Sequence, residues 1–351
     1  MSRPAISEDS FRFPIRPHLL QALEGLPDCA PDRDMRGGVW LDANESPYNT
    51  PLNRYPEAPH ELEAALARIR SVRPEQVFAC RGTTDAMQLL LQLCCTPRQD
   101  NVVTTEPTLS PVRKLCVLLG VECRTARLDE QFRLSSETLL RACNDRTRLL
   151  FLCSPNNPTG NLLERNEILR AAASFRGLVV VDEAYVDFSR STSLLPELTH
   201  LPNLVVIQSF SAILASAGLC LATIYAHAEL LHHLRRIRPA HFLSTVVQTE
   251  GLKALRRYTD ADRQVAQILD ERSKVMAAFR LLPCCEAVYR SDANFFLARM
   301  QQFGLVRQRL AEGQVHVADC SGLPGCADCL RITVGLSGEN SRLLGILRAI
   351  M

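Results

Sequence analysis

Lysine is scarce in this chain of 351 amino acids. Lysine and arginine together number 40, but lysine occurs only as Lys114, Lys253 and Lys274. Arginine therefore carries nearly all of the positive charge. Chemistry that needs a side-chain amine can use only these three positions, which fall in predicted helices. Each of the three is more simply interpreted as a solvated surface charge.

Several other features are also absent. No apolar run approaches about 18 residues, which excludes a membrane-spanning helix. The formal net charge of +2 gives no electrostatic reason to expect nucleic acid or an anionic membrane as partner. The N-terminus lacks the pattern of a signal peptide, so we expect a cytoplasmic protein. The 14 cysteines are too dilute for a disulfide scaffold, and we expect them to be small buried thiols in a reducing compartment.

Short apolar runs alternate with helical patterns from about residue 76. The predicted strands are Gln76–Cys80, Val102–Thr105, Leu149–Cys153, Gly177–Val181 and Leu204–Ile207, and predicted helices begin at Asp85, Pro111 and Glu164. β-Branched runs separated by helices predict an α/β fold with a mainly parallel sheet covered on both faces. In such sheets, ligands bind beyond the carboxyl ends of the strands.

The pattern changes after about residue 245. A long polar helix is predicted near Asp260–Phe279, followed by the strands Asn294–Arg299, Val315–Ala318 and Leu330–Val334. These elements predict a smaller α+β C-terminal domain. We therefore expect a large α/β domain over residues 38–245, and a small domain made of residues 1–37 and 246–351.

Three motifs lie where predicted strands end. Ser154–Gly160 (SPNNPTG) follows one strand, and Val181–Phe188 (VDEAYVDF) closes the next. Arg81–Met87 (RGTTDAM) passes from strand to helix, so its backbone N–H groups and the helix dipole can hold an anion. Taken alone, the first motif is a turn, Asp182 could cap the turn that follows it, and Thr83 or Thr84 could cap a helix.

Further motifs surround these three. They are Leu41–Pro47 (LDANESP), Asn53–Pro56 (NRYP), Gln208–Ala222 (QSFSAILASAGLCLA), Asn294–Arg299 (NFFLAR) and Cys329–Gly335 (CLRITVG). In this order the motifs resemble those of fold-type I pyridoxal phosphate (PLP) aminotransferases, and most closely those of histidinol-phosphate aminotransferases. The resemblance covers roughly residues 38 to 350. It implies the PLP-transferase fold type I and a homodimer with shared sites.

The resemblance also implies roles for individual residues. Asn157 and Tyr185 would hydrogen-bond the 3-oxygen of PLP, and Asp182 would pair with the pyridine nitrogen and keep it protonated. Arg331 would bind the substrate, since its planar fork suits a carboxylate or phosphate. The remaining positions, which would contact the cofactor phosphate or its surroundings, are Thr83, Thr84, Ser209, Ser211 and, from the neighbouring subunit, Tyr55.

Four positions depart from the family pattern. Ala212 stands where the resemblance places the lysine that bonds PLP and shuttles the proton, so no catalytic residue is assigned. Cys220 stands in place of the arginine that binds the PLP phosphate. Leu109 replaces the aromatic residue stacked on the ring, and Ala318 replaces a second substrate arginine. An engineered lysine-to-alanine change would explain Ala212 alone, so we favour a naturally altered site.

A further cluster has the residue types of a metal site. His316, Cys320, Cys326 and Cys329 lie within a short span, and Cys326 and Cys329 have the C-x-x-C spacing of zinc ligands. Only one such pair is present, and Cys329 falls at the start of a predicted strand. We therefore expect buried thiols, an exposed histidine and no metal. Because His316 is predicted on the same strand face as Ala318, it could enter the space that the missing arginine leaves.

Three functions are compatible with these observations. The first is a noncatalytic or repurposed relative of histidinol-phosphate aminotransferase that binds a small anionic or amino-acid-like ligand. The second is an enzyme of different chemistry in the same pocket, acting on a small amino-acid-like or phosphorylated substrate. It would use PLP or pyridoxamine phosphate noncovalently, or no cofactor. The third is a pseudoenzyme that partners an active aminotransferase.

Overall fold

The larger of two sheets is mainly parallel. The computed structural model describes residues 11–24, 38–109, 111–189 and 193–350. The strand order of this sheet is β1-β7-β6-β5-β4-β2-β3. Strands β2 to β6 run parallel to one another, whereas β7 is antiparallel to both β6 and β1. The bounds are β1 Val77–Cys80, β2 Asn101–Glu106, β3 Glu122–Arg127, β4 Thr147–Cys153, β5 Leu178–Asp182, β6 Leu204–Ser209 and β7 Ala222–Tyr225. The predicted mainly parallel sheet is confirmed.

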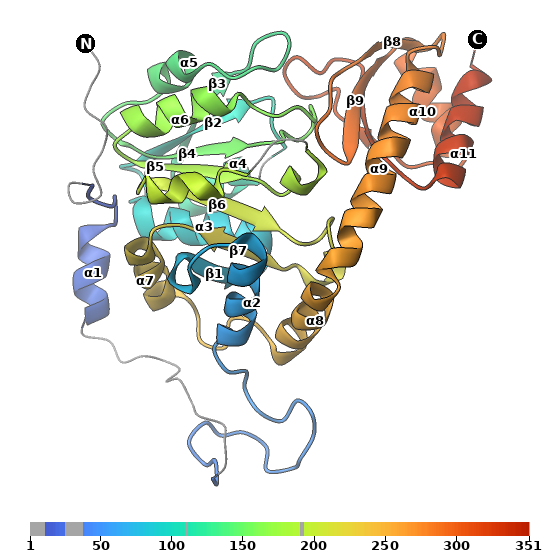
Figure 1. Cartoon of the computed structure of the whole chain (residues 1–351). Helices are drawn as coiled ribbons and strands as arrows, with labels where there is room; N and C mark the ends of the chain where they lie inside the picture. Colours follow the sequence, from blue (N-terminus) through green and yellow to red (C-terminus); the bar gives the residue numbers. More distant parts are fainter. Residues whose placement is uncertain (1–10, 25–37, 110, 190–192, 351) are drawn as a thin grey trace.

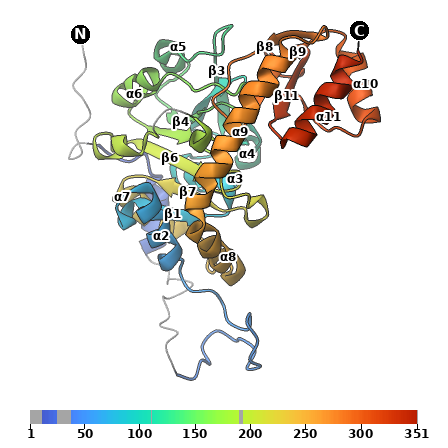
Figure 2. The ribbon, with the colours of Figure 1, turned by 45° about the vertical axis from the view of Figure 1, so that its right-hand side comes forward.

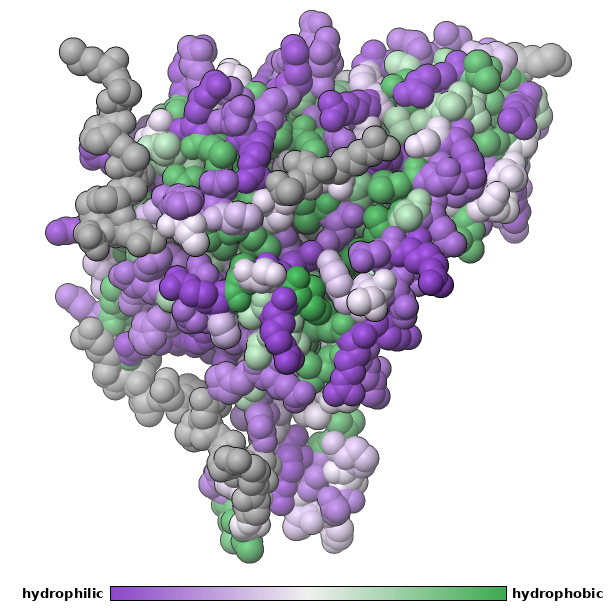
Figure 3. Space-filling model, viewed as in Figure 1, coloured by the Kyte–Doolittle hydropathy of each residue, from purple (hydrophilic) through white to green (hydrophobic). Residues whose placement is uncertain are grey.

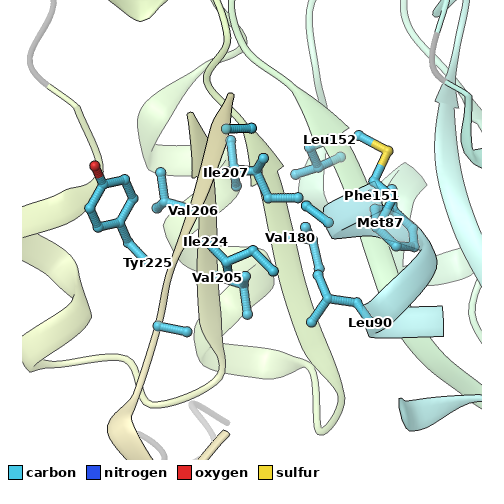
Figure 4. Packing of buried hydrophobic residues seen from close by; sticks show 14 of the residues in the cluster. Met87, Leu90, Phe151, Leu152, Val180, Val205, Val206, Ile207, Ile224 and Tyr225 are labelled. Carbon is cyan, nitrogen blue, oxygen red and sulfur yellow. The ribbon is translucent and has the colours of Figure 1, made fainter. Parts of the chain in front are cut away.

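The central strands are buried along almost their whole length, so both faces of the sheet are covered. The covering helices are α2 His60–Arg70, α3 Gly82–Cys94, α4 Val112–Leu119, α5 Ser136–Arg141, α6 Arg165–Ser174 and α7 Ala228–Ile237. Figure 4 shows part of the core between α3 and the sheet, where Met87 of α3 lies beside Phe151 of β4.

A second, antiparallel sheet lies at the C-terminal end of the chain. Its order is β10-β11-β9-β8, with bounds β8 Cys285–Val288, β9 Phe295–Met300, β10 Ala318–Asp319 and β11 Cys329–Thr333. Helices α10 Phe303–Glu312 and α11 Ser337–Arg348 accompany it. The predicted small α+β unit is confirmed. The strand predicted over Val315–Ala318 starts only at Ala318, because Val315 still donates to the Leu310 carbonyl and closes α10.

One long helix joins the two units. Helix α9, Tyr258–Phe279, follows α8 (Thr245–Arg256) and runs from the large sheet to the small one (Figures 1 and 2). Ala261 near its start packs in the large core, and Phe279 at its end packs in the small core. Movement of the small unit relative to the large one would therefore have to involve this helix.

The described N-terminal residues contact the large unit. Phe13, before α1 (Pro17–Glu24), and Leu19, within α1, pack on the large core. The Arg16 N–H donates to the Leu93 carbonyl at 3.1 Å. These contacts favour the large unit for residues 11–24. Residues 1–10 and 25–37 lie outside the described part of the chain, so the predicted domain division stays a prediction.

Residues 38–59 form an arm that projects from the large unit (Figures 1 and 3). The arm exposes Val39, Leu41, Tyr48 and Leu52, of which Leu41 is 88% accessible. Large apolar side chains held this far out of a core are typical of a surface that contacts another chain. In the described residues, no helix combines the length and the apolar character that crossing a membrane requires.

Candidate ligand site

The predicted site residues of the large unit gather at the carboxyl edge of its sheet. Asp182 is the last residue of β5, and in the register of the two strands it pairs with Cys153, the last residue of β4. Ser209 is the last residue of β6, the next strand. Parallel strands present their carboxyl ends at one edge, so segments far apart in sequence meet there, as expected.

Three of the predicted residues form one hydrogen-bonded chain. Asn157 donates from Nδ2 to the Tyr185 hydroxyl at 3.0 Å, and its Oδ1 accepts from an Arg331 terminal nitrogen at 2.7 Å. The amide of Asn157 thus connects the loop after β4 with the loop after β5 and with β11 of the small unit. The structure brings together residues predicted to contact the ring and the residue predicted to bind the substrate.

Asp182 is buried, with 8% of its surface exposed. Burial raises the pKa of its carboxyl to about 7; the Ala184 N–H opposes this shift and the nearby Glu183 adds to it. Asp182 Oδ1 accepts that N–H at 3.0 Å, so it does stabilise the turn after β5. Among the described residues, no salt bridge to Asp182 is present.

The predicted anion site lies at the start of α3. This helix begins at Gly82, and its N-cap is Arg81, which makes no side-chain capping bond. The interpretation of Thr83 or Thr84 as the helix cap is therefore wrong, since both lie inside the first turn. Ser209 and Ser211 form their own pair on the loop after β6, with 3.1 Å between the hydroxyl oxygens.

Cys220 lies beside this helix start. A Cβ built on Gly82 would be 3.6 Å from the Cys220 carbonyl oxygen, and Gly82 has a φ of +83°. The Cys220 side chain is exposed and its backbone is left-handed, with φ of 49°. The position predicted for the phosphate arginine thus adjoins the anion site, but its side chain brings no charge.

The other altered positions border the same region. Ala212 is half-buried in the turn that follows β6, where its carbonyl accepts the Ala215 N–H at 3.3 Å. Leu109 is 44% exposed, and its backbone N–H donates to the Asn157 carbonyl at 2.6 Å. Ala318 pairs directly with Arg331 across β10 and β11. Small or apolar side chains therefore stand around the retained polar chain.

Tyr55 lies outside this constellation within one chain. It is half-exposed in the projecting arm, and its ring stacks on that of His241 at 4.3 Å between centroids. Its backbone N–H donates to Glu45 at 2.6 Å. The contact of Tyr55 with a neighbouring subunit stays a prediction.

The thiol cluster is buried and His316 is exposed. In the described parts of the chain, no group of three histidine, cysteine, aspartate or glutamate side chains is arranged to hold a metal ion. Every described cysteine is free. Cys326 and Cys329 occupy the ends of a turn in which the Cys329 N–H donates to the Cys326 carbonyl at 3.0 Å.

The three lysines lie on the surface, as predicted. Lys114 is exposed on α4. Lys253 pairs with Glu250 at 2.8 Å, and Lys274 pairs with Asp270 at 2.6 Å. All of these partners lie on the lysines' own helices.

Two site residues were not anticipated from the sequence. The Phe295 ring meets the Tyr185 ring edge-on at 4.9 Å between centroids, and the Arg331 guanidinium carbon lies 5.4 Å from the Phe295 centroid. Glu183 is buried and accepts from Gln208 at 2.9 Å and from the Leu194 N–H at 2.8 Å. Phe295 lies inside the motif NFFLAR and Glu183 inside VDEAYVDF. Membership of these motifs was the only signal in the sequence for either residue.

Comparison with known proteins agrees with this geometry. The model of the family described as aminotransferase class I and II matches residues 38–347. A histidinol-phosphate aminotransferase from Bacteroides thetaiotaomicron is 39% identical over 311 residues, covering 88% of this chain and 90% of the relative. One from Flavobacterium psychrophilum is 34% identical over 313 residues, covering 89% and 90%.

Solved structures show the same fold. The histidinol-phosphate aminotransferase from Clostridium acetobutylicum superposes with a TM-score of 0.78 at 16% identity, covering 85% of this chain and 91% of that one. The enzyme from Sinorhizobium meliloti, in complex with pyridoxal-5'-phosphate, gives a TM-score of 0.73 at 19% identity, covering 83% and 81%.

Proposed function

Because the chain belongs to the class I and II aminotransferase family, we propose that it binds a small anionic ligand with a protonated ring nitrogen. PLP or pyridoxamine phosphate, held without a covalent bond, fits this description. We also propose that the protein does not carry out ordinary lysine-dependent transamination. When bound, such a cofactor supplies a ring that accepts electrons.

The buried carboxyl of Asp182 is the observation that carries the proposal. An ionised carboxylate at this depth is costly unless a cation or several donors stabilise it. The pKa of Asp182 near 7 reflects that cost. A protonated pyridine nitrogen would supply the missing partner and return the carboxyl to its ionised form. Asn157 and Tyr185, hydrogen-bonded to each other, lie in the loops that follow β4 and β5, at the same edge of the sheet as Asp182.

The phosphate end fits less well. The N–H groups at the start of α3 and the hydroxyls of Ser209 and Ser211 remain as donors. The residue beside them is Cys220, so these contacts lack the charge of an arginine. We expect weak binding of the phosphate group and a modest overall affinity.

Arg331 supports an anionic group elsewhere on the ligand. One terminal nitrogen of Arg331 donates to Asn157, and the buried Nε of Arg331 has no hydrogen-bond partner in the described residues. Arginine binds carboxylates through paired N–H groups, so Arg331 is suited to the acid group of an amino-acid-like ligand.

Calorimetric titration with pyridoxamine phosphate tests the proposal. We expect millimolar or better binding by the wild type, weakened about tenfold or more in Asp182→Asn. Binding should also weaken in Arg331→Ala, because Asn157 loses the hydrogen bond that orients its amide. Asp100→Asn is the matched control, since Asp100 is another buried carboxyl, paired with Arg148 at 2.8 Å at the opposite edge of the sheet. Absence of binding, or equal binding in all four proteins, would contradict the proposal.

The exposed apolar arm favours a second candidate, in which the chain partners another subunit. The exposed side chains of the arm support a homodimer, or a complex with an active relative: Val39, Leu41, Tyr48 and Leu52.

Free cysteines throughout the described residues support a cytoplasmic location. Light scattering of the purified chain, alone and with an active relative, distinguishes these assemblies. An enzyme of different chemistry would use the same pocket and would require turnover of a substrate to establish it.

A further inference from the structure

We propose that Arg70, on α2, is a positioning residue for the ligand site and holds the loops after β5 and β6 in place together. The inference rests on the proposed function, because ligand affinity is one of its readouts. Arg70 does not touch the residues of the hydrogen-bonded chain Asn157–Tyr185–Arg331; it acts through Asp187 and Phe210.

The guanidinium of Arg70 is paired with a largely buried carboxylate, that of Asp187. It donates to both carboxylate oxygens of Asp187, at 2.7 and 2.9 Å, and the two side chains are only 11% and 12% exposed. A third bond goes to the Tyr258 hydroxyl at 2.8 Å, which in turn donates to Asp187 at 3.1 Å. This paired geometry depends on the planar fork of arginine, which lysine cannot reproduce.

The acid belongs to the loop that carries the ring-facing residues. Asp187 lies two residues after Tyr185 and five after Asp182, in the short 3₁₀ helix η3 (Val186–Phe188). Val186 closes this turn by donating to the Glu183 carbonyl at 3.1 Å. Fixing Asp187 therefore limits how far the Tyr185 hydroxyl can move from Asn157.

The other face of the guanidinium holds the loop that carries the altered lysine position. The guanidinium carbon lies 5.4 Å from the centroid of the fully buried Phe210 ring. Phe210 stands between Ser209 and Ser211, and its carbonyl accepts from the Ser216 hydroxyl at 3.0 Å. The same arginine thus contacts the segment that supplies the serine hydroxyls and Ala212.

Tyr258 connects the same network to the start of α9. It is the first residue of α9, the helix that leads to the sheet carrying Arg331. Three segments therefore meet at one largely buried cation: the loop after β5, the loop after β6 and the start of α9. Strands and helices form through backbone hydrogen bonds, so they do not themselves require these side-chain contacts.

The test compares Arg70→Lys and Asp187→Asn with the control Asp100→Asn. Thermal unfolding, the dissociation constant for pyridoxamine phosphate and backbone amide hydrogen exchange are measured in each. We expect the dissociation constant to rise at least tenfold in both test variants. Exchange should accelerate about tenfold in residues 183–188 and 209–216. In the control Asp100→Asn, the dissociation constant and the exchange rates of the two segments should stay unchanged. This should hold even if its unfolding temperature falls as much as those of the test variants.

Two results would overturn the inference: unchanged exchange in both segments, or equal acceleration in Asp100→Asn. If the wild type binds no pyridoxamine phosphate, the proposed ligand is wrong, but hydrogen exchange still tests the positioning role. If both test variants fail to fold, Tyr258→Phe removes only one hydroxyl from the network. It should then speed exchange in the same two segments by a smaller factor, and no change there would again contradict the proposal.

Discussion

The two sides of the candidate site differ in the side chains that they present. On the ring-facing side, Asn157, Tyr185 and Arg331 are joined by hydrogen bonds, and Asp182 is buried beside them. On the lysine and phosphate side, Ala212 and Cys220 offer neither an amine nor a guanidinium. Buried polar groups are costly without partners, whereas small apolar groups need none. The ring-facing side thus presents polar groups that a ligand could satisfy, whereas the other side presents neither an amine nor a guanidinium at Ala212 and Cys220.

The largest difference that we expect between the two sides is in the covalent attachment of PLP, which is either present or absent. After incubation with PLP and reduction with borohydride, intact mass should show no stoichiometric pyridoxyl adduct on the wild type. Ala212→Lys, which restores an amine on the lysine side, should gain one adduct at that position. A stoichiometric wild-type adduct on Lys114, Lys253 or Lys274 would show that the amine has moved rather than vanished.

The pH dependence of stability tests the ring-facing side. The pKa of Asp182 is raised from 3.8 to about 7 in the folded protein, so between these values the folded state holds the proton more tightly than the unfolded state does. The resulting stabilisation is complete below about pH 4 and is lost as the pH rises through 7.

Relative to Asp182→Asn, the wild-type free energy of unfolding should fall by up to about 4 kcal/mol across that window, at about 1.4 kcal/mol per pKa unit. Urea denaturation of both proteins at pH 4, 5.5 and 8 measures the difference. If the difference in free energy of unfolding between the two proteins does not vary with pH, the Asp182 carboxyl is ionised throughout this pH range. Saturating pyridoxamine phosphate should reduce the fall.

Restoring the charge of the phosphate side sharpens the comparison. A charge-assisted hydrogen bond contributes about 1.5–3 kcal/mol, so Ala212→Lys combined with Cys220→Arg should bind PLP roughly tenfold to a hundredfold more tightly than Ala212→Lys alone. We expect Ala212→Lys alone not to restore robust transamination. Leu281→Arg, at a position 85% exposed in the small unit, controls for added net charge. Equal affinity with and without Cys220→Arg would contradict the assignment of Cys220.

Much of this arrangement could be predicted from the sequence because its signals are local. Strands β4, β5 and β6 are continuous apolar runs, and the motifs at their ends fixed Asn157, Asp182 and Tyr185 as neighbours through the resemblance. Strand β3 was not anticipated, since Glu122–Arg127 is polar and lies at the exposed edge of the sheet.

Long-range partners could not be predicted for a different reason. Arg70 and Asp187 are 117 residues apart, and neither stands in a pattern that points to the other. Phe295 was within a recognised motif, but its contact with Tyr185 depends on how the small unit sits on the large one. Such packing is decided by the whole fold, not by a local sequence.

The smallest expected effect concerns the position where the two sides meet. Leu109 is 44% exposed, and its backbone is fixed to Asn157 at 2.6 Å, so a new side chain there changes the surface above the ring without moving the chain. Aromatic pairs add about 0.5–1.5 kcal/mol beyond the area they bury. Leu109→Phe should therefore strengthen pyridoxamine phosphate binding by roughly twofold to tenfold, measured by calorimetry. Leu109→Met, which is similarly apolar but not aromatic, should leave the affinity close to that of the wild type. If both substitutions act alike, or neither changes the affinity while Asp182→Asn does, the ring does not stack at this position and the ligand is held from the Asp182 side alone.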